Sequence, residues 1–403
     1  MDHVEELGAD FFADPHATYR RWRDRGAVHE YRMPSGTRCW VITGYSECRT
    51  ALADPRLAKS AAAFDELTGK QTTPFGTDGA NLITNMLFSD PPDHTRLRKL
   101  VNAAFTAHTV RALRPRVEEI TSGLLDRMAE QEQVDLVDAF AAPLPIAVIS
   151  ELLGVPLADR GRFRAWVNSW ISVGSVTSAD EDDEAVEAAR AMTEYLTDLV
   201  RTTRERPGTD LLSALVRARD DGDKLSEREL ISMAFLLLVA GFETTINLIG
   251  NSVYALLCHP DQLLALRRDP SLVPAAVEEF LRYDGPVNHA TFRYATEPVV
   301  FDGIEIPTGG LVSIALPAAN RDPERFAHPD RLDVSRDAGG HIAFGYGIHF
   351  CVGAPLARLE AEIAFTQLLA RFPNLGPAVP LERMRWQPSV RKRGLTALPV
   401  RLR

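Results

Sequence analysis

Helical periodicity dominates residues 90 to 285 and constrains the fold more than any other feature of the sequence. Apolar residues recur there at intervals of three and four, and charged residues fill the positions between them. Turn residues at Asp302-Gly303 and Thr308-Gly309-Gly310 predict hairpins in the later part of the chain. We therefore expect a mainly α-helical fold with small β-sheets. Short runs of β type flank the helical region at Cys39–Thr43, Val299–Phe301 and Leu311–Ala315.

The composition favours one large globular domain. The chain has 403 residues, of which 45% are hydrophobic, and no Gly/Ser-rich linker or fixed-period repeat divides it. We therefore expect a single domain over residues 1–403. The net charge of -10 argues against a protein that binds nucleic acid, because neutralising phosphates requires a broad basic surface.

Cysteine usage and the N-terminus indicate a cytoplasmic protein. The four cysteines are far apart and form no C-x-x-C pair, which argues against both a zinc site and a disulfide framework. The first residues lack the charged-then-apolar order of a signal peptide. The most apolar run, Leu230–Phe242, is shorter than the roughly 18 residues that a membrane span needs. We interpret that run as part of a buried helix and expect no membrane association.

A long helix is predicted to open with a capping box at Ser226–Glu229 and to continue past Asn251. The stretch Ala240–Thr245 in its middle breaks local rules, because glycine weakens a helix interior and a carboxylate follows the apolar run. Such exceptions are expected at functional sites. Thr244 could turn its hydroxyl toward the Ala240 carbonyl and open a groove. It is equally possible that the glycine serves packing and that the threonine hydroxyls bond within the helix.

Two further helices carry charged pairs that are ambiguous in isolation. In one, Asp90 is the expected N-cap, Pro91 suits the first position, and His94 and Arg98 share a face. In the other, Pro274–Arg282, Glu279 and Arg282 are three residues apart. Taken alone, each pair could be an ordinary exposed polar face.

The segment from Phe344 to Gly353 is the most informative part of the sequence. It reads F-G-Y-G-I-H-F-C-V-G and precedes a predicted helix, so Cys351 lies just before a helix N-terminus. The dipole and free amides there stabilise a thiolate, and the glycines allow a flat ligand to approach the backbone. The loop does not match the glycine fingerprint of dinucleotide-binding proteins, because Phe350 occupies the position of the third glycine. Cys351 could also be a catalytic thiol beside His349 or a buried structural cysteine.

Together these segments resemble the cytochrome P450 family, specifically its soluble bacterial members of secondary-metabolism type. The loop matches the haem-binding signature F-G-x-G-x-H-x-C-x-G at every fixed position, and the likeness extends from about Pro15 to Pro399. The resemblance implies the cytochrome P450 fold, a triangular prism. Haem b (iron protoporphyrin IX) would lie between the long central helix and the helix after Cys351. It also implies a monomeric monooxygenase.

The resemblance assigns roles to individual residues. Cys351 would be the metal ligand, bound to the haem iron. Thr244 and Glu243 would be catalytic, as the alcohol and acid that direct proton delivery. Glu279 and Arg282 would join a third basic residue in a buried structural triad, for which we favour Arg331 over the Arg325 position. The residues expected to contact the cofactor are His94, Arg98, Ala240, Arg293, Phe344, Gly345, His349, Cys351 and Gly353.

The expected reaction inserts one atom of O2 into a bulky, largely apolar molecule such as a polyketide, macrolide or terpenoid. The electrons would come from a ferredoxin and its reductase, attracted by Arg96, Lys99 and Arg358. Residues 163–184 are expected to form a mobile lid with a hinge near Gly174. The alternative functions are those of a non-catalytic haem sensor and of an enzyme for C–C coupling or dehydration of a carrier-bound substrate. The expected pocket residues are Met86, Leu87, Val173, Leu236, Val239, Val287, His289, Ala290, Phe292 and Val390.

Overall fold

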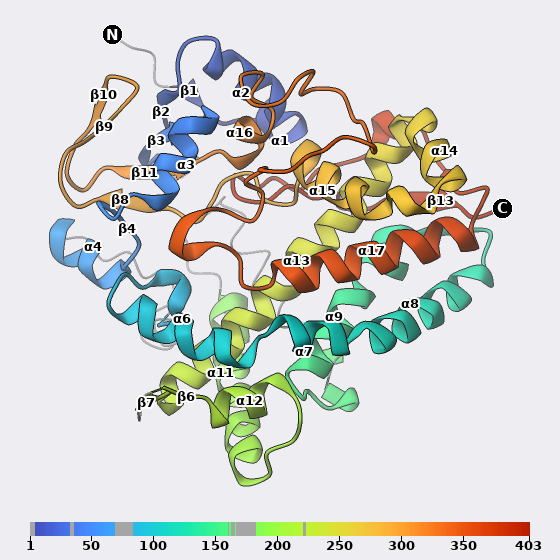
Figure 1. Cartoon of the computed structure of the whole chain (residues 1–403), viewed down its shortest axis with the longest axis horizontal. Helices are drawn as coiled ribbons and strands as arrows, with labels where there is room; N and C mark the ends of the chain where they lie inside the picture. The colour runs from blue at the N-terminus through green and yellow to red at the C-terminus, as the bar shows by residue number, and fades with distance from the viewer. Residues whose placement is uncertain are drawn as a thin grey trace. The chain divides into compact units, whose positions relative to one another are not determined.

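Helices make up most of the computed structural model, which describes residues 5–32, 36–68, 84–159, 161–162, 166, 183–220 and 223–403 (Figure 1). The helices are α1 (Ala9–Ala13), α2 (Pro15–Arg23), α3 (Tyr45–Ala53), α4 (Ala61–Thr68), α6 (Asp93–Ala104), α7 (Ala107–Ala112), α8 (Arg114–Ala129), α9 (Pro143–Leu152), α11 (Asp183–Glu205), α12 (Leu211–Arg217), α13 (Glu227–Cys258), α14 (Pro260–Arg268), α15 (Val273–Asp284), α16 (Leu316–Asn320) and α17 (Ala354–Arg371).

Among the described residues, short strands form four sheets, in line with the small β-sheets expected from the sequence. The strands are β1 (Glu5–Glu6), β2 (Val28–Arg32), β3 (Arg38–Ile42), β4 (Leu57–Ala58), β5 (Gln133–Asp135), β6 (Arg219–Asp220), β7 (Asp223–Lys224), β8 (Arg293–Ala295), β9 (Val299–Phe301), β10 (Ile304–Ile306), β11 (Leu311–Ile314), β12 (Gly376–Pro377) and β13 (Pro399–Arg401). The largest sheet has the order β1-β2-β3-β11-β8-β4.

One of the two predicted hairpins is present. Asp302 and Gly303 both have positive φ angles, of 49° and 74°, and they connect the antiparallel strands β9 and β10. The turn at residues 308–310 instead leads into β11, which pairs in parallel with β3 and antiparallel with β8. The second hairpin prediction is therefore wrong, because β11 completes the larger sheet.

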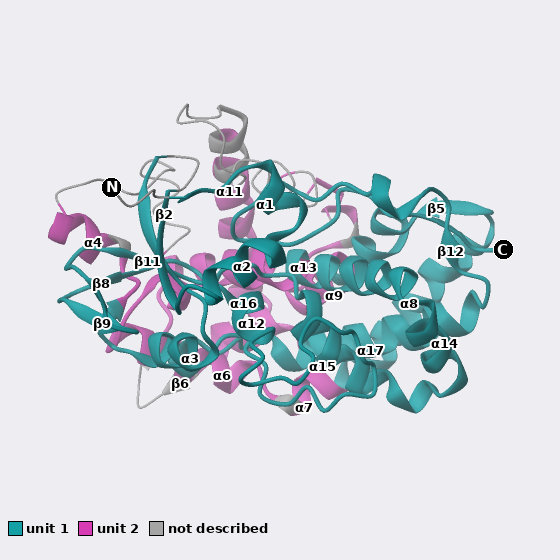
Figure 2. Cartoon of the chain, turned by 90° about the horizontal axis from the view of Figure 1, so that it is seen from above, with its two compact units in different colours: residues 1–57, 112–145, 243–403 teal, residues 58–111, 146–242 magenta. Residues whose placement is uncertain are grey.

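The chain divides into two compact units, each defined by the contacts among its own residues (Figure 2). Unit 1 contains residues 1–57, 112–145 and 243–403, and unit 2 contains residues 58–111 and 146–242. In unit 1, α17 packs against α8 and α15. Its apolar residues Leu356, Leu359 and Ile363 are buried, and the rings of Phe280 and Phe365 meet with centroids 5.2 Å apart. That a single domain spans residues 1–403 remains a prediction.

The predicted long central helix is α13, which runs through both units. The capping box is confirmed, because the Ser226 amide donates to Glu229 (2.8 Å) and the Glu229 amide donates to the Ser226 hydroxyl (3.3 Å). By length and composition alone α13 could cross a membrane, although the apolar run that we identified was shorter. In the structure 61% of its most apolar window is buried inside the protein. A core helix of a globular protein has the same character.

The predicted N-cap of α6 is wrong. The Asp90 carboxylate instead accepts hydrogen bonds from the backbone amides of Lys59 (3.0 Å) and Ser60 (2.9 Å), and α6 begins only at Asp93. Pro91 and Pro92 delay the start because a proline disfavours helical geometry in the residue before it. Asp90 therefore joins α6 to the turn that precedes α4.

Candidate functional site

The loop that contains Cys351 leads from Phe344 into the N-terminus of α17. The Cys351 amide donates to the Phe344 carbonyl oxygen (2.9 Å). Gly345 and Gly347 adopt positive φ angles of 75° and 74°, which glycine tolerates best. An added Cβ at Gly347 would also lie 3.0 Å from the Leu52 carbonyl oxygen. The exposed thiol of Cys351 thus precedes α17 directly, where the helix dipole favours a thiolate.

The other three cysteines are less suited to form a thiolate. Burial raises the pKa of Cys39 to about 12 and that of Cys48 well above its ordinary value. Cys258 is exposed at the end of α13, but partial burial raises its pKa as well. A neutral thiol is a poor metal ligand and a poor nucleophile. Cys351 therefore remains the best candidate.

Arg358 on α17 brings positive charge to the Cys351 loop. Its guanidinium binds both carboxylate oxygens of Glu278 on α15 (2.6 and 2.8 Å) and lies 4.6 Å from the centroid of the Phe344 ring. The hydrogen bonds that Arg358 donates to Glu278 raise the pKa of Arg358, and the negative charge of a Cys351 thiolate acts in the same direction. His341 also lies 3.0 Å from Glu278. These contacts hold the loop against α15 and favour a negatively charged sulfur.

Arg358 and Arg96, which are predicted to attract a redox partner, form ion pairs with carboxylates. Arg358 binds Glu278 in unit 1, and Arg96 on α6 forms an ion pair with Glu229 in unit 2. Each carboxylate offsets the charge of its arginine, which weakens the long-range field available to an acidic protein. The third residue, Lys99, is exposed on α6.

The buried cluster around Glu279 corrects one predicted site residue. Glu279 and Arg282 are fully buried and form a bidentate pair (2.6 and 2.8 Å). The third basic residue is Arg336, whose Nε lies 3.2 Å from Glu279. Arg331, which we had predicted, is exposed and contributes only its carbonyl oxygen, which accepts from Arg282 (3.3 Å) and Arg336 (3.2 Å). The triad is therefore Glu279, Arg282 and Arg336. The guanidinium of Arg336, five residues after Arg331, makes the third contact with Glu279.

The middle of α13 interrupts an otherwise buried apolar helix. Ala240 is exposed, and Val239, Gly241, Glu243 and Thr244 are partly exposed, whereas residues 232–238 and 247–253 of the same helix are buried. An added Cβ at Gly241 would lie 3.0 Å from the Ile149 side chain, so this glycine allows close packing. Gly241 therefore serves packing, as one interpretation of the sequence predicts, and Glu243 and Thr244 have accessible surface.

The C-terminal segment 389–394 lies directly on α13 within unit 1. Three α13 residues spaced by four positions contact this segment, as expected for one helix face: Glu243, Asn247 and Asn251. Gly394 is needed there, because an added Cβ would lie 2.1 Å from Asn247. Sequence reasoning did not identify Lys392 as the partner of Glu243. The contacts are a Glu243–Lys392 ion pair, the approach of Gly394 to Asn247, and a hydrogen bond from Asn251 Nδ2 to the Arg393 carbonyl oxygen (2.9 Å).

The predicted cofactor contacts fall in both units. In unit 1, Arg293 is buried on β8 and donates to the Leu57 carbonyl oxygen (3.4 Å), and His349 is partly exposed beside Cys351. In unit 2, His94 and Arg98 lie on α6. Burial and then the charge of Arg98 lower the pKa of His94, so its imidazole is neutral near pH 7. Each set contains donors that could bind carboxylates.

The predicted pocket residues differ in exposure. Val287, Ala290 and Phe292 in unit 1 are partly exposed, and so are Leu87 and Val239 in unit 2, whereas Met86 and Leu236 are buried. His289 corrects the prediction: its Nδ1 lies 2.7 Å from the Ser313 hydroxyl, and its ring packs among Phe11, Tyr19 and Tyr31. Val390 is likewise buried in the same core. Val173 and nearly all of the predicted lid lie outside the described residues.

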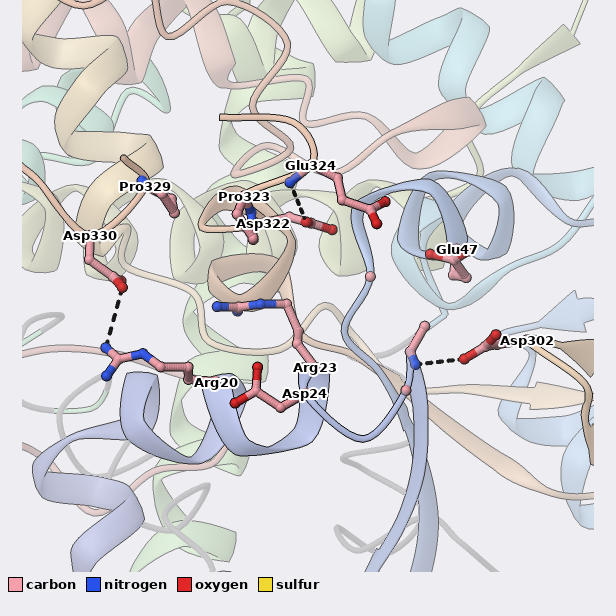
Figure 3. A pocket seen from close by; sticks show the side chains of 13 residues that line it. Arg20, Arg23, Asp24, Glu47, Asp302, Asp322, Pro323, Glu324, Pro329 and Asp330 are labelled. Carbon is pink, nitrogen blue, oxygen red and sulfur yellow. Dashed lines mark hydrogen bonds and ion pairs between the residues drawn. The ribbon is translucent and has the colours of Figure 1, made fainter. Parts of the chain in front are cut away.

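A separate cleft of about 560 Å³ lies among charged residues of unit 1 (Figure 3). Three of the carboxylates that line it bind backbone amides or balance arginines. Asp302 accepts from the Ala27 amide (2.8 Å), and Asp322 accepts from the Glu324 amide (2.9 Å). Arg20 lies 3.3 Å from Asp330. These contacts have a structural role, and none involves a predicted site residue.

Comparison with known proteins agrees with the geometry of the Cys351 loop. The family model described as Cytochrome P450 matches residues 181–375. The chain is 52% identical to Cytochrome P450 107B1 of Saccharopolyspora erythraea, over 97% of this chain and 96% of that protein. It is 46% identical to 6-deoxyerythronolide B hydroxylase of the same organism, over 100% of both chains. The structure of the tirandamycin C-bound P450 monooxygenase TamI superposes with a TM-score of 0.90 at 50% identity, covering 99% of this chain and 100% of TamI.

The chain belongs to the cytochrome P450 family and has the cytochrome P450 fold. It is a monooxygenase, an oxidoreductase whose cofactor is haem b. The residues present fit that group. The loop offers an accessible thiol next to glycines that leave the backbone open, and Arg293 and His349 in the same unit can meet carboxylates.

Proposed function

We propose that the chain oxidises a bulky, largely apolar small molecule by hydroxylation or epoxidation, with electrons from a ferredoxin and its reductase. The observation that carries this proposal is the exposed Cys351 thiol before α17, with Arg358 beside it. Cys351 would bind the haem iron. When bound, the haem supplies the chemistry that activates O2.

The chain's own residues would hold the cofactor and control protons. His94, Arg98, Arg293 and His349 would bind its carboxylates, because two charges taken out of water need charge-assisted partners. Thr244 would donate and accept a hydrogen bond on the side facing the substrate, and Glu243 would relay protons from water. Lys392 restrains Glu243, so the carboxylate is positioned in the partly exposed stretch of α13.

The substrate class rests on the apolar residues that remain partly exposed. Val287, Ala290 and Phe292 suit apolar contacts rather than hydrogen bonds. Relatives are named for 6-deoxyerythronolide B and associated with tirandamycin C, which makes these compounds the first to test.

The ferrous carbon monoxide complex tests the proposed ligand. Wild type should show the red-shifted Soret band that a thiolate ligand produces, and Cys351→His should lose it. Cys258→Ser is the matched control and should keep the band, because Cys258 lies at the far end of α13. A band that survives in Cys351→His overturns the assignment.

Product analysis tests the reaction. With a ferredoxin, its reductase and NAD(P)H, the product should gain one oxygen atom derived from O2. A haem sensor would bind ligands without consuming NAD(P)H. An enzyme for C–C coupling would consume O2 without adding oxygen to its product, whereas a dehydrating enzyme would release water from its substrate without net consumption of O2.

A further inference from the structure

Arg393 is a buried arginine in the segment 389–394 that lies on α13. Its guanidinium donates to the carbonyl oxygens of Phe12 (3.0 Å) and Ala13 (3.3 Å) at the end of α1. Its Nε also forms an ion pair with Asp284 Oδ1 (3.4 Å) at the end of α15. One side chain therefore ties this segment to an N-terminal helix and to α15, all within unit 1.

Asp284 is the buried acid of this contact, and its Oδ1 also lies 3.0 Å from His16 Nε2 on α2. Burial lowers the pKa of His16, so near pH 7 its imidazole is neutral and donates a hydrogen bond. Burial alone would raise the pKa of Asp284, but the charge of Arg393 and the hydrogen bond from His16 outweigh it and lower the pKa. Asp284 is therefore ionised. We call Arg393, Asp284 and His16 the Arg393 anchor.

The backbone around Arg393 is paired like a short antiparallel strand. Lys392 forms an antiparallel bridge with Val287, and the Arg393 amide donates to the Pro286 carbonyl oxygen (3.0 Å). Successive side chains of an extended backbone point to opposite faces. Arg393 accordingly turns toward α1 and α15, and Lys392 turns the other way, to Glu243 on α13. Fixing Arg393 therefore fixes the direction of Lys392.

Lys392 needs such a restraint to stay paired with Glu243. A lysine has a long flexible stem, so its ion pair persists only where the backbone holds the ammonium group within reach. Glu243 lies in the partly exposed stretch of α13, where water competes for both charges. The Arg393 anchor is buried and supplies the restraint from the opposite face of the segment.

We propose that Asp284 and Arg393 are positioning residues, which hold Lys392 against Glu243 and thereby place this acid for proton delivery. The inference rests on the proposed function, which assigns the proton relay to Glu243. Efficient use of electrons then depends on a buried ion pair that acts through Lys392.

Hydrogen exchange of the purified holoenzyme, followed by mass spectrometry, tests the anchor. Arg393→Met removes the guanidinium, so the amides of residues 389–394 should exchange roughly 10- to 100-fold faster, as expected when charge-assisted hydrogen bonds are lost. Arg393→Lys keeps the positive charge without the planar fork and should lie between wild type and Arg393→Met. Asp284→Asn keeps an oxygen for His16 and should give a smaller increase. These two milder variants test the anchor even if Arg393→Met does not fold.

Arg23→Met is the matched control. Arg23 on α2 is half-buried and donates to the Ala318 carbonyl oxygen (3.0 Å), so this variant removes the same charge and a similar bond within unit 1. Exchange of residues 389–394 should remain as in wild type. The anchor is refuted if the Arg393 and Asp284 variants change this exchange no more than Arg23→Met does.

A double-mutant cycle tests whether the anchor acts through Lys392. NAD(P)H oxidation with ferredoxin and its reductase is measured without added substrate, so that electrons end in hydrogen peroxide or in water. The ratio of NAD(P)H to O2 consumed separates these two products. Arg393→Met and Lys392→Met should each raise the ratio of peroxide to water by roughly 2- to 10-fold, because a displaced acid directs protons less well. Arg23→Met should not change it.

The combined variant gives the decisive comparison. In the Lys392→Met background, Arg393→Met should add little, because both substitutions release the same carboxylate. Equal effects of Arg393→Met in both backgrounds would show that it acts independently of Lys392 and would overturn the proposal. Glu243→Gln tests the proposed function separately. If that variant leaves the ratio of peroxide to water unchanged, the proton relay is wrong, whereas the exchange data still report whether Arg393 holds the segment.

Discussion

Replacing Arg336 with Met tests the corrected triad. Arg336 Nε lies 3.2 Å from the fully buried Glu279, and its guanidinium also donates to the carbonyl oxygens of Ala327 (2.6 Å) and His328 (3.2 Å). After Arg336→Met, Glu279 keeps Arg282 but loses one charge-assisted bond. Hydrogen bonds to charged groups contribute roughly 1.5–3 kcal/mol, so we expect the free energy of unfolding to fall by about 2–3 kcal/mol.

Arg331→Met is the matched control, because it removes the same net charge from an exposed side chain. Its carbonyl oxygen, the part that joins the cluster, remains. Surface substitutions of this kind usually change stability by less than about 0.5 kcal/mol.

Urea unfolding of the haem-loaded protein, followed by far-UV circular dichroism, measures the difference. With a slope of about 3 kcal/mol per molar urea, Arg336→Met should lower the midpoint by roughly 0.7–1 M and Arg331→Met by less than about 0.2 M. Equal shifts in the two variants, or a larger shift in Arg331→Met, would refute the corrected triad.

Three other predictions concern proton transfer and pH. Thr244→Ala should still bind haem and substrate but divert electrons into hydrogen peroxide, measured with several substrates as peroxide and product formed per NAD(P)H; unchanged coupling contradicts its role. Burial raises the pKa of Glu278, but hydrogen bonds from Arg358 and His341 outweigh it and lower the pKa to about 2. That stabilisation is present above pH 4.5 and is lost as the pH falls toward 2, so the urea midpoints of wild type and Glu278→Gln should converge from about pH 5 to about pH 3. Burial raises the pKa of Glu360 from 4.5 to about 8, so stability should fall as the pH rises between these values. Glu360→Gln should therefore raise the urea midpoint more at about pH 8 than at about pH 5, and an equal effect at both would contradict this pKa.

The helices and the Cys351 loop could be predicted because their signals are local. Apolar spacing, the capping box at Ser226 and the glycines around Cys351 each act over a few residues. The prediction that Asp90 is an N-cap was wrong for two reasons. Two prolines follow Asp90 and delay the start of the helix, and its carboxylate binds backbone amides that are distant in the sequence. Local patterns do not reveal such competition.

The partners of buried charges could not be predicted, because they come from distant parts of the chain. Arg336 is 57 residues from Glu279, and Lys392 is 149 residues from Glu243. Arg331 and Arg336 flank the same turn, and only the backbone path decides which guanidinium points inward. His289 was misplaced for a related reason: an alternating apolar segment does not show which of its residues faces the core.

The ion pair between Lys392 and Glu243 matters for engineering this enzyme. Residues 390–393 are an obvious target for a mutant library aimed at new substrates, since this segment lies on the partly exposed stretch of α13. The same four positions include the lysine that restrains the acid on α13. A library that randomises all of them will therefore change the efficiency of electron use together with regioselectivity. Keeping Lys392 constant while varying position 391 separates the two properties and makes selection for product yield interpretable.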